Sequence, residues 1–304
     1  MDWRLKSLIR HSLLALPSGD RFYRWLTVSL LGTNAGMAYK WFRVMPAHVR
    51  VLQEFFPDDP RGQRLWCFDS GATMAAGLAI AVASDMPGLL TDRTDRLRER
   101  YCWVSRRVLK EQGEALATLA AAPVQRVADL LLNTDELGVQ QALATMAITY
   151  APRHAVALEP VWRGQLGCVF SAGTLEHYTP EALEQEVAGM AHALKPGGVL
   201  SHVVDHRDHR WHADKTVHPL AHLTMEEECY QRQFANTLEY HNRWLRGRYV
   251  DLYRRYGFRV ECRDAVVYPS DLPPFDRATL APAFADATAE ELNGLVTHFI
   301  AVKR

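Results

Sequence analysis

The sequence predicts an α/β fold: a doubly wound, mostly parallel sheet with helices on both faces, an antiparallel last strand and an N-terminal helical cap. Short apolar runs that end in an acid or in small residues alternate with helical segments, an order typical of parallel βαβ units. The clearest unit is 64–77, where an apolar run ends at Asp69 and small residues lead into an alanine-rich helix. The chain closes with strand-like runs at 258–262 and 295–302, which predict an antiparallel pair.

Breaks in this pattern indicate the domain organisation. Residues 1–60 carry aromatic side chains at helical spacing and predict the helical cap, and a stretch rich in proline and aspartate ends it. Residues 61–304 form the main domain, with a helical insertion at about 94–147 between its second and third strands. Two interpretations of the cap are open. Its helices pack on the main domain as ordinary core helices, or they cover a ligand site or form a surface for a membrane or a partner.

The same signals place the remaining strands and helices. After the first strand we expect strands at 89–91, 147–150, 166–170 and 199–204. Between the last two, Thr179 caps a helix that begins with Pro180 and runs to Leu194. One long amphipathic helix is predicted over 224–256, and a short one after Thr288.

Composition excludes several classes of protein. Lys+Arg and Asp+Glu both number 35 among the 304 residues, so no net field attracts nucleic acid or an anionic membrane. The apolar stretch 26–38 is too short to span a bilayer and no secretory signal is evident, so no transmembrane segment is expected. Five scattered cysteines without a CxxC pair are typical of reduced thiols in a cytoplasmic protein. The oligomeric state stays open, a homodimer included.

The turn after the first strand is a candidate anion site. Gly71 and its small neighbours let the backbone approach a ligand, and the start of the next helix offers unpaired N–H groups. Asp92 ends the second strand some twenty residues further on, where folds of this kind hold ribose hydroxyls. The competing interpretation is an ordinary structural turn, with Asp92 as the cap of the next helix.

Four short motifs stand at the ends of the predicted strands and helices. They are Phe68-Asp-Ser-Gly-Ala-Thr73, Ser171-Ala-Gly-Thr-Leu-Glu-His177, Leu194-Lys-Pro-Gly-Gly198 and Tyr256-Gly-Phe258. Together, over about residues 62–304, they resemble the class I S-adenosylmethionine-dependent methyltransferases. The run 202–205 with Asp208 and His209, and the stretches 240–243 and 249–258, are similar to a bacterial branch linked to polysaccharide or small-molecule methylation. The resemblance implies a seven-stranded Rossmann-like sheet and S-adenosylmethionine as the cofactor.

The resemblance also implies cofactor contacts at particular residues. The pocket for the methionine end of the cofactor would be shaped by Asp69, Gly71, Ala72 and Thr73. Asp92 would hold the ribose hydroxyls, and Ser171 and Ala172 would line the passage where the cofactor's sulfur meets the acceptor. Two positions depart from the family's pattern, because Ala72 replaces a glycine and Gly167 replaces an acid. These departures leave open a degenerate relative that transfers no methyl group.

The histidine- and aspartate-rich stretch after the fifth strand is the candidate catalytic segment. Methyl transfer to an oxygen needs an aligned acceptor and removal of its proton. A histidine oriented by an aspartate suits this task, since the unperturbed imidazole titrates near neutrality. Seven of the chain's 13 histidines fall between His202 and His241. We expect His209 to be the base, with Asp208 or Asp205 as its partner and His202 in the same catalytic group.

Two other interpretations of this stretch remain open. The first is a polar loop with solvated histidines. The second is a divalent metal site that binds a diol-bearing acceptor. Its ligands would come from Asp205, His206, Asp208, His209 and His212. No metal belongs to the leading hypothesis.

Three further residues are candidate substrate ligands. Arg243, together with Asn242, has the forked donors that bind a carboxylate or a phosphate, although a surface ion pair is the commoner fate of an arginine. His177 follows the fourth strand and either contacts the substrate or is satisfied within the fold.

The sequence therefore predicts a cytoplasmic enzyme that methylates a hydroxyl group of a sugar or another small-molecule substrate. The alternatives are a methyltransferase-like binding or scaffold protein without transfer activity, and a metal-dependent hydrolase. The acceptor and the methylated atom are not identified by the sequence.

Overall fold

The structure is a computed structural model that describes a large part of the chain. The described residues are 12–13, 15–17, 19, 22, 33–58, 62–70, 86–92, 141, 143–144, 147–152, 160–234, 240–270, 272 and 274–304, with the backbone alone at 33–43. Most of residues 1–32 of the predicted cap, the helix expected after Thr73 and nearly all of the insertion at 94–147 lie outside these residues.

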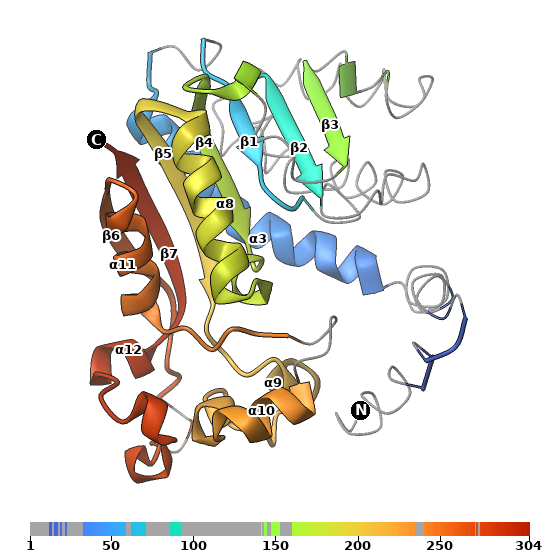
Figure 1. The fold of residues 1–304 in the computed structure, drawn as a ribbon, viewed down its shortest axis with the longest axis vertical. Coiled ribbons are helices and arrows are strands. Elements are labelled where there is room, and N and C mark those ends of the chain that lie inside the picture. The colour runs from blue at the N-terminus through green and yellow to red at the C-terminus, as the bar shows by residue number, and fades with distance from the viewer. Residues whose placement is uncertain are drawn as a thin grey trace.

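A single mixed sheet of seven strands forms the centre of the molecule (Figure 1). The strands are β1 Leu65–Cys67, β2 Gly88–Asp92, β3 Ile148–Pro152, β4 Leu166–Ala172, β5 Leu194–Asp205, β6 Phe258–Val267 and β7 Gly294–Lys303. Their order is β3-β2-β1-β4-β5-β7-β6, and β7 runs antiparallel to both β5 and β6 while the other pairs are parallel. The predicted fold class is therefore confirmed, including the antiparallel pair at the end of the chain.

The centre of the sheet is the point where the chain changes direction. β1 pairs in parallel with β2 on one side and with β4 on the other, so that Leu65 lies opposite both Gly88 and Cys168. The connections from β1 and β4 then lead to opposite edges of the sheet. In open α/β sheets, a crevice for ligands forms outside the carboxyl ends of the strands at such a switch point.

The helices lie on both faces of the sheet and beyond its carboxyl end. They are α3 Thr33–Phe55, η2 Pro160–Trp162, η3 Leu175–His177, α8 Pro180–Ala193, α9 Arg210–Ala213, η4 Ala221–Thr224, α10 Glu227–Phe234, α11 Arg246–Arg255, η5 Arg277–Thr279, η6 Pro282–Phe284 and α12 Ala289–Asn293. The predicted cap of α8 is confirmed, because the Thr179 side chain accepts a hydrogen bond from the Ala182 N–H at 3.3 Å. Within the described residues, no helix combines the length and the apolar character of a membrane span.

The long helix predicted over 224–256 is wrong. The structure has the short helices η4, α10 and α11 there, with an irregular segment, 240–245, before α11. Arg243 in that segment has a φ of 56°, in the left-handed region that no α-helix contains. Hydrogen bonds from this segment to the turn after β4, described below, outweigh its helical propensity.

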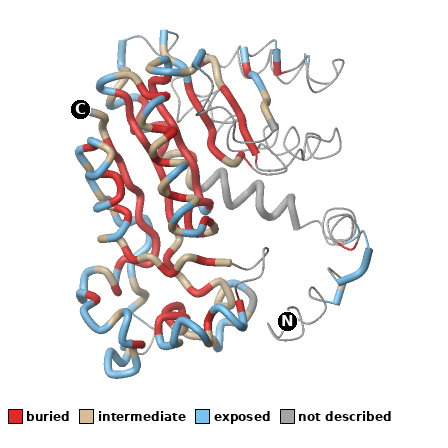
Figure 2. The backbone as a smooth tube through the Cα atoms, in the orientation of Figure 1, coloured by how far each residue is buried: buried red, intermediate tan, exposed pale blue. Residues whose placement is uncertain are grey.

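Two layers of helices bury the sheet, as the buried strands in Figure 2 show. Leu183, Val187 and Met190 of α8 form one buried stripe, and Tyr249 and Tyr253 of α11 join them on the same face. On the other face, α3 packs against β4 and β5, with Val51 against Val199 and Ile300. In Figure 1 the helices α8 and α11 lie in front of the sheet and α3 lies behind it.

Polar side chains join α3 to the sheet. His48 Nδ1 lies 2.7 Å from Ser201 Oγ, which in turn lies 2.8 Å from His298 Nε2. Burial lowers the pKa of His298 to about 4, with a further lowering by Arg263, and burial also holds the pKa of His48 well below its ordinary value. Both rings are therefore neutral in the folded chain at physiological pH.

This pKa shift predicts that acid destabilises the fold. In the unfolded chain His298 binds a proton near pH 6.5, whereas in the folded chain it does so only near pH 4. Between these values the unfolded state binds more protons, so stability falls as the pH falls through this window, by about 1 kcal/mol per pH unit from this residue. Urea unfolding from pH 7 to pH 4.5 should show a shallower slope for His298→Gln than for the parent chain. The exposed His192→Gln should keep the parent slope, and equal slopes in all three chains would contradict this prediction.

Candidate functional site

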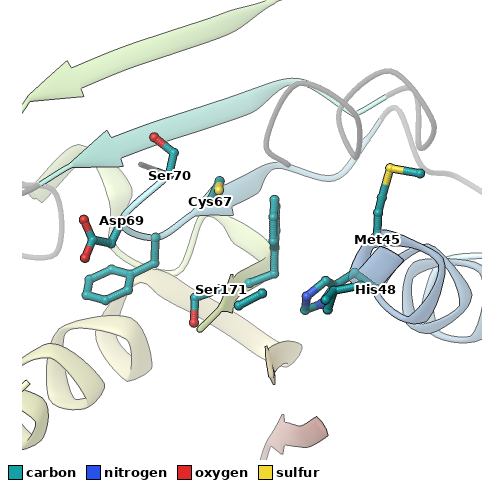
Figure 3. A pocket seen from close by; sticks show the side chains of 10 residues that line it. Met45, His48, Cys67, Asp69, Ser70 and Ser171 are labelled. Atoms are coloured by element: carbon teal, nitrogen blue, oxygen red, sulfur yellow. The ribbon is translucent and has the colours of Figure 1, made fainter. Parts of the chain in front are cut away.

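A pocket lies at the switch point, between the carboxyl ends of β1 and β4 and the helix α3 (Figure 3). The empty space between its walls, open solvent at the mouth included, is about 300 Å³. The wall from the sheet consists of Cys67, Phe68, Asp69, Ser70, Phe170, Ser171 and Ala172, and the wall from α3 of Val44, Met45 and His48. The sheet therefore supplies two phenylalanine rings together with small and polar groups, and α3 covers the pocket with one methionine, one valine and one histidine.

The loop that leaves β1 has an uncommon backbone conformation. Asp69 has a φ of 53°, which aspartate tolerates better than most residues. The loop is held from both sides, since the Phe68 N–H donates to the Phe170 carbonyl at 2.9 Å and the Ser70 N–H to the Thr91 carbonyl at 2.7 Å. Tyr178 donates from its hydroxyl to Asp69 Oδ2 at 3.4 Å. These bonds fix the position of a carboxylate on the pocket wall.

Ser70 is a pocket residue that the sequence analysis did not single out. Its side chain is buried, and its Oγ has no hydrogen-bond partner among the described residues. A buried hydroxyl without a partner is unfavourable by about 1–3 kcal/mol, so a ligand that bonds to it would be stabilised there. The only sequence signal is its place in the motif that follows Phe68.

Asp92 ends β2 at the same edge of the sheet and is fully buried. Its neighbour Thr91 accepts a hydrogen bond from Trp66 Nε1 at 2.9 Å, which ties β2 to β1. The structure thus places an acid at the end of the second strand, as expected. Gly71, Ala72 and Thr73 lie outside the described residues, and their roles stay predictions.

His202 lies inside the sheet rather than at its rim. It is fully buried on β5, with Nδ1 2.7 Å from Ser171 Oγ and its ring stacked at 6.1 Å on Tyr253. Burial lowers the pKa of His202 to about 3. His202 therefore holds the Ser171 side chain in place. A direct contact between His202 and an acceptor would require the sheet to open.

A cluster of histidines lies beyond the carboxyl ends of β4 and β5. His209, just before α9, has its ring centre 4.8 Å from that of His177, 4.7 Å from that of His241 and 5.5 Å from that of His212. We call these four residues the histidine cluster. Burial, with the neighbouring histidines His241 and His177, holds the pKa of His209 well below its ordinary value. His209 and His177 thus come together although they follow different strands.

The two aspartates proposed to orient His209 bind other groups. Asp208 forms a buried ion pair with Arg210. The shortest contact in it joins Arg210 Nη2 to Asp208 Oδ2 at 2.5 Å. Asp205 accepts two hydrogen bonds from the Arg207 guanidinium, at 2.7 and 2.6 Å, and lies 3.1 Å from His212 Nε2. Although burial alone would raise it, these hydrogen bonds hold the pKa of Asp205 well below its ordinary range. Neither carboxylate is hydrogen-bonded to His209.

Glu176 is a second functional candidate that the sequence analysis missed. It is 1% exposed, and its Oε2 has no hydrogen-bond partner among the described residues. Burial, with the nearby charge of Asp205, raises the pKa of the Glu176 carboxyl well above its ordinary value. Its only sequence signal is its place in the motif Ser171–His177.

Asn242 and Arg243 bind their own chain. Asn242 donates from Nδ2 to the carbonyls of Leu175 and Tyr178, at 3.1 and 3.2 Å, and its Oδ1 accepts two further bonds. The Arg243 guanidinium is buried, donates to the carbonyls at positions 222 and 225 and to Glu227, and packs 4.2 Å from the Tyr230 ring centre. These contacts satisfy both side chains within the fold, so we carry neither forward as a substrate ligand.

Comparisons with known proteins find likeness in structure alone. No family model and no curated protein matches the chain. Among solved structures, it is similar to the Haemonchus contortus phosphoethanolamine N-methyltransferase 2 in complex with S-adenosyl-L-methionine. The TM-score is 0.47 and the identity 15%, over 93% of this chain and 60% of that one.

Two further similar structures are also named as methyltransferases. The CurJ carbon methyltransferase matches with a TM-score of 0.39 and 14% identity, over 81% of this chain and 49% of that one. A TehB-like SAM-dependent methyltransferase from Corynebacterium glutamicum matches with a TM-score of 0.42 and 12% identity, over 90% of this chain and 99% of that one. The chain thus spans about half to three fifths of the length of the first two. At this level the likeness concerns the fold, which the strand order of the chain establishes by itself.

The hydrogen bonds of Asn242 predict that this residue supports the fold. Asn242→Ala should lower the free energy of unfolding by about 1–3 kcal/mol, because two carbonyls after β4 and two donors lose their partner. Urea unfolding measures this change, and the exposed Asn293→Ala is the matched control, with an expected change within about 0.5 kcal/mol. Unchanged stability of Asn242→Ala would mean that its contacts are dispensable and would restore it as a substrate ligand candidate.

Proposed function

We propose that the chain is an S-adenosylmethionine-dependent methyltransferase that acts on a hydroxyl oxygen of a sugar or another small metabolite. The observation that carries this proposal is the pocket at the switch point, where Asp69 and Ser70 after β1 meet Ser171 at the end of β4. The motifs Leu-Glu-His177 and Leu194-Lys-Pro-Gly-Gly198, which resemble the family, lie after β4 and at the start of β5.

The described residues fit a cofactor of this kind. A cation is favoured beside the Asp69 carboxylate, and the Ser70 hydroxyl, buried without a partner, can bond to a polar group of the ligand. Asp92, at the end of β2, would accept hydrogen bonds from the ribose hydroxyls. When bound, S-adenosylmethionine supplies a methyl group activated by a positively charged sulfur.

The acceptor would lie between the pocket and the histidine cluster. Tyr178 connects the two, because its hydroxyl donates to Asp69 while the preceding residue, His177, belongs to the cluster. Ser171 and Ala172 line the pocket on the side of β4 and would border the passage between cofactor and acceptor. We assign removal of the acceptor's proton to the histidine cluster, with His209 at its centre.

The pocket predicts that Asp69 contributes to cofactor affinity through its charge. Asp69→Asn keeps the size of the side chain and tolerates the positive φ, but removes the negative charge, so the Kd for S-adenosylmethionine should rise about tenfold. Isothermal titration measures this, with the exposed Asp58→Asn as the matched control at unchanged Kd. Absence of heat and of a thermal shift with the parent chain at about millimolar cofactor would overturn the proposed function.

The cluster predicts a different effect for His209. His209→Ala should lower kcat by about a hundredfold or more and leave the cofactor Kd within about twofold, because proton removal is lost while the pocket is intact. The assay is methyl transfer to a panel of small hydroxyl compounds, with the exposed His192→Ala as control at parent activity. Equal losses of turnover and cofactor affinity would place His209 in the pocket instead. Cofactor binding without turnover on any acceptor would favour the binding protein over the enzyme.

A further inference from the structure

The side chains after β4 and before α9 form a second site that the proposed cofactor pocket does not use. One donor atom from each of Glu176, His177 and His209 lies within 4.8 Å of the others. Two imidazole nitrogens and one carboxylate oxygen are a common donor set for catalytic zinc and for non-haem iron, and they leave coordination positions open. We propose that Glu176, His177 and His209 bind one divalent transition-metal ion, such as Zn²⁺.

The buried carboxylate gives this proposal its second, independent support. Glu176 is 1% exposed, and its Oε2 has no hydrogen-bond partner among the described residues. A buried acid is unfavourable unless it is paired or coordinates a metal. An ion between Glu176 and the two histidines would supply this missing partner.

His177 is oriented for coordination by its own hydrogen bond. His177 Nδ1 lies 2.9 Å from the Tyr240 carbonyl, to which it donates, so the ring's lone pair is on Nε2. Metal-binding histidines commonly donate their other N–H to a carbonyl in this way, which fixes the tautomer and the orientation of the ring. Asn242 holds the same two segments together, since its N–H donates to the Glu176 carbonyl at 2.8 Å.

The other side chains around this site are less suitable as metal ligands. Asp205, His209 and His212 also bring donor atoms within 4.8 Å, but Asp205 already accepts two bonds from Arg207 and lies 3.1 Å from His212 Nε2. Both nitrogens of His241 are engaged, with the Arg243 N–H and the Asp205 carbonyl. Glu176, His177 and His209 therefore form the site, and the others surround it.

Metal binding would draw the three side chains together. Bonds of about 2.0–2.1 Å at tetrahedral angles place donor atoms about 3.3 Å apart, so the side chains would rotate toward one another from their present separations of up to 4.8 Å. The remaining position would take a water molecule or a hydroxyl oxygen, whose pKa the ion lowers. In this one respect the inference rests on the proposed function. With the ion bound, the lone pair of His209 is used for coordination, so His209 would act through the ion, and an acceptor hydroxyl bound there would lose its proton to water more readily. Binding of the ion itself does not depend on methyl transfer.

The test is titration of the full, chelator-treated chain with Zn²⁺ alone, without the cofactor. The parent chain should bind about one ion with a Kd of about 1 µM or tighter. Glu176→Gln and His209→Gln, which keep the side-chain size, should each weaken binding about 10- to 100-fold. The exposed Glu228→Gln and His192→Gln are matched controls and should bind as the parent does. Circular dichroism checks that each variant is folded, and His177→Gln replaces any variant that is not.

Two results would overturn the proposal. The first is no saturable heat with the parent chain up to about 100 µM Zn²⁺. The second is binding that Glu176→Gln, His177→Gln and His209→Gln leave unchanged, because the ion would then lie elsewhere. Substitution with Co²⁺ gives a further readout, since visible absorption bands should appear in the parent chain and be lost in the same variants. Failure of cofactor binding, which would end the proposed function, leaves each of these outcomes unaffected.

Discussion

The parallel pairing of β1 with both β2 and β4 is the constraint on which the rest of the molecule depends. Because Leu65 lies opposite both Gly88 and Cys168, the three strands end at one edge of the sheet. Asp69 and Ser171, about a hundred residues apart in the sequence, meet there in one pocket. The side chains that precede these ends are mostly apolar and are buried on both faces of the sheet, so the helices packed on each side fix the position of the strands.

Several polar side chains beyond the carboxyl ends of the strands are held by hydrogen bonds and ion pairs within the fold. Asn242 and Arg243 are fully engaged with their own chain, and Asp205 and Asp208 bind arginines. Among the described residues, the buried polar atoms without such partners include Ser70 Oγ in the pocket and Glu176 Oε2 beside the histidine cluster, and also His202 Nε2 and both ring nitrogens of His222. Buried polar atoms without partners are unfavourable, so the presence of Ser70 Oγ and Glu176 Oε2 at the same edge of the sheet indicates two places for ligands.

Much of the fold could be predicted from the sequence because its strands are short, apolar and bounded by strong turn signals. The predicted strands overlap β1 to β7, and the cap at Thr179 and the antiparallel pair of β6 and β7 are as expected. The prediction of a helix over 224–256 is wrong because tertiary hydrogen bonds hold the segment before α11 in an irregular conformation, which local propensity does not reveal. For the site, sequence spacing indicated the acids at the ends of β1 and β2. It could not show that Arg243 is buried, that Glu176 lacks a partner, or that His48 reaches the pocket from α3.

Hydrogen exchange of the backbone amides with and without S-adenosylhomocysteine tests the central claim, that the crevice after β1 holds the cofactor. Saturating ligand should protect the amides of 67–70 and 170–172, which border the pocket, and leave those of β6 at the far edge of the sheet unchanged. Protection confined to other segments, or none at all at saturation, would contradict the assignment of this pocket to the cofactor.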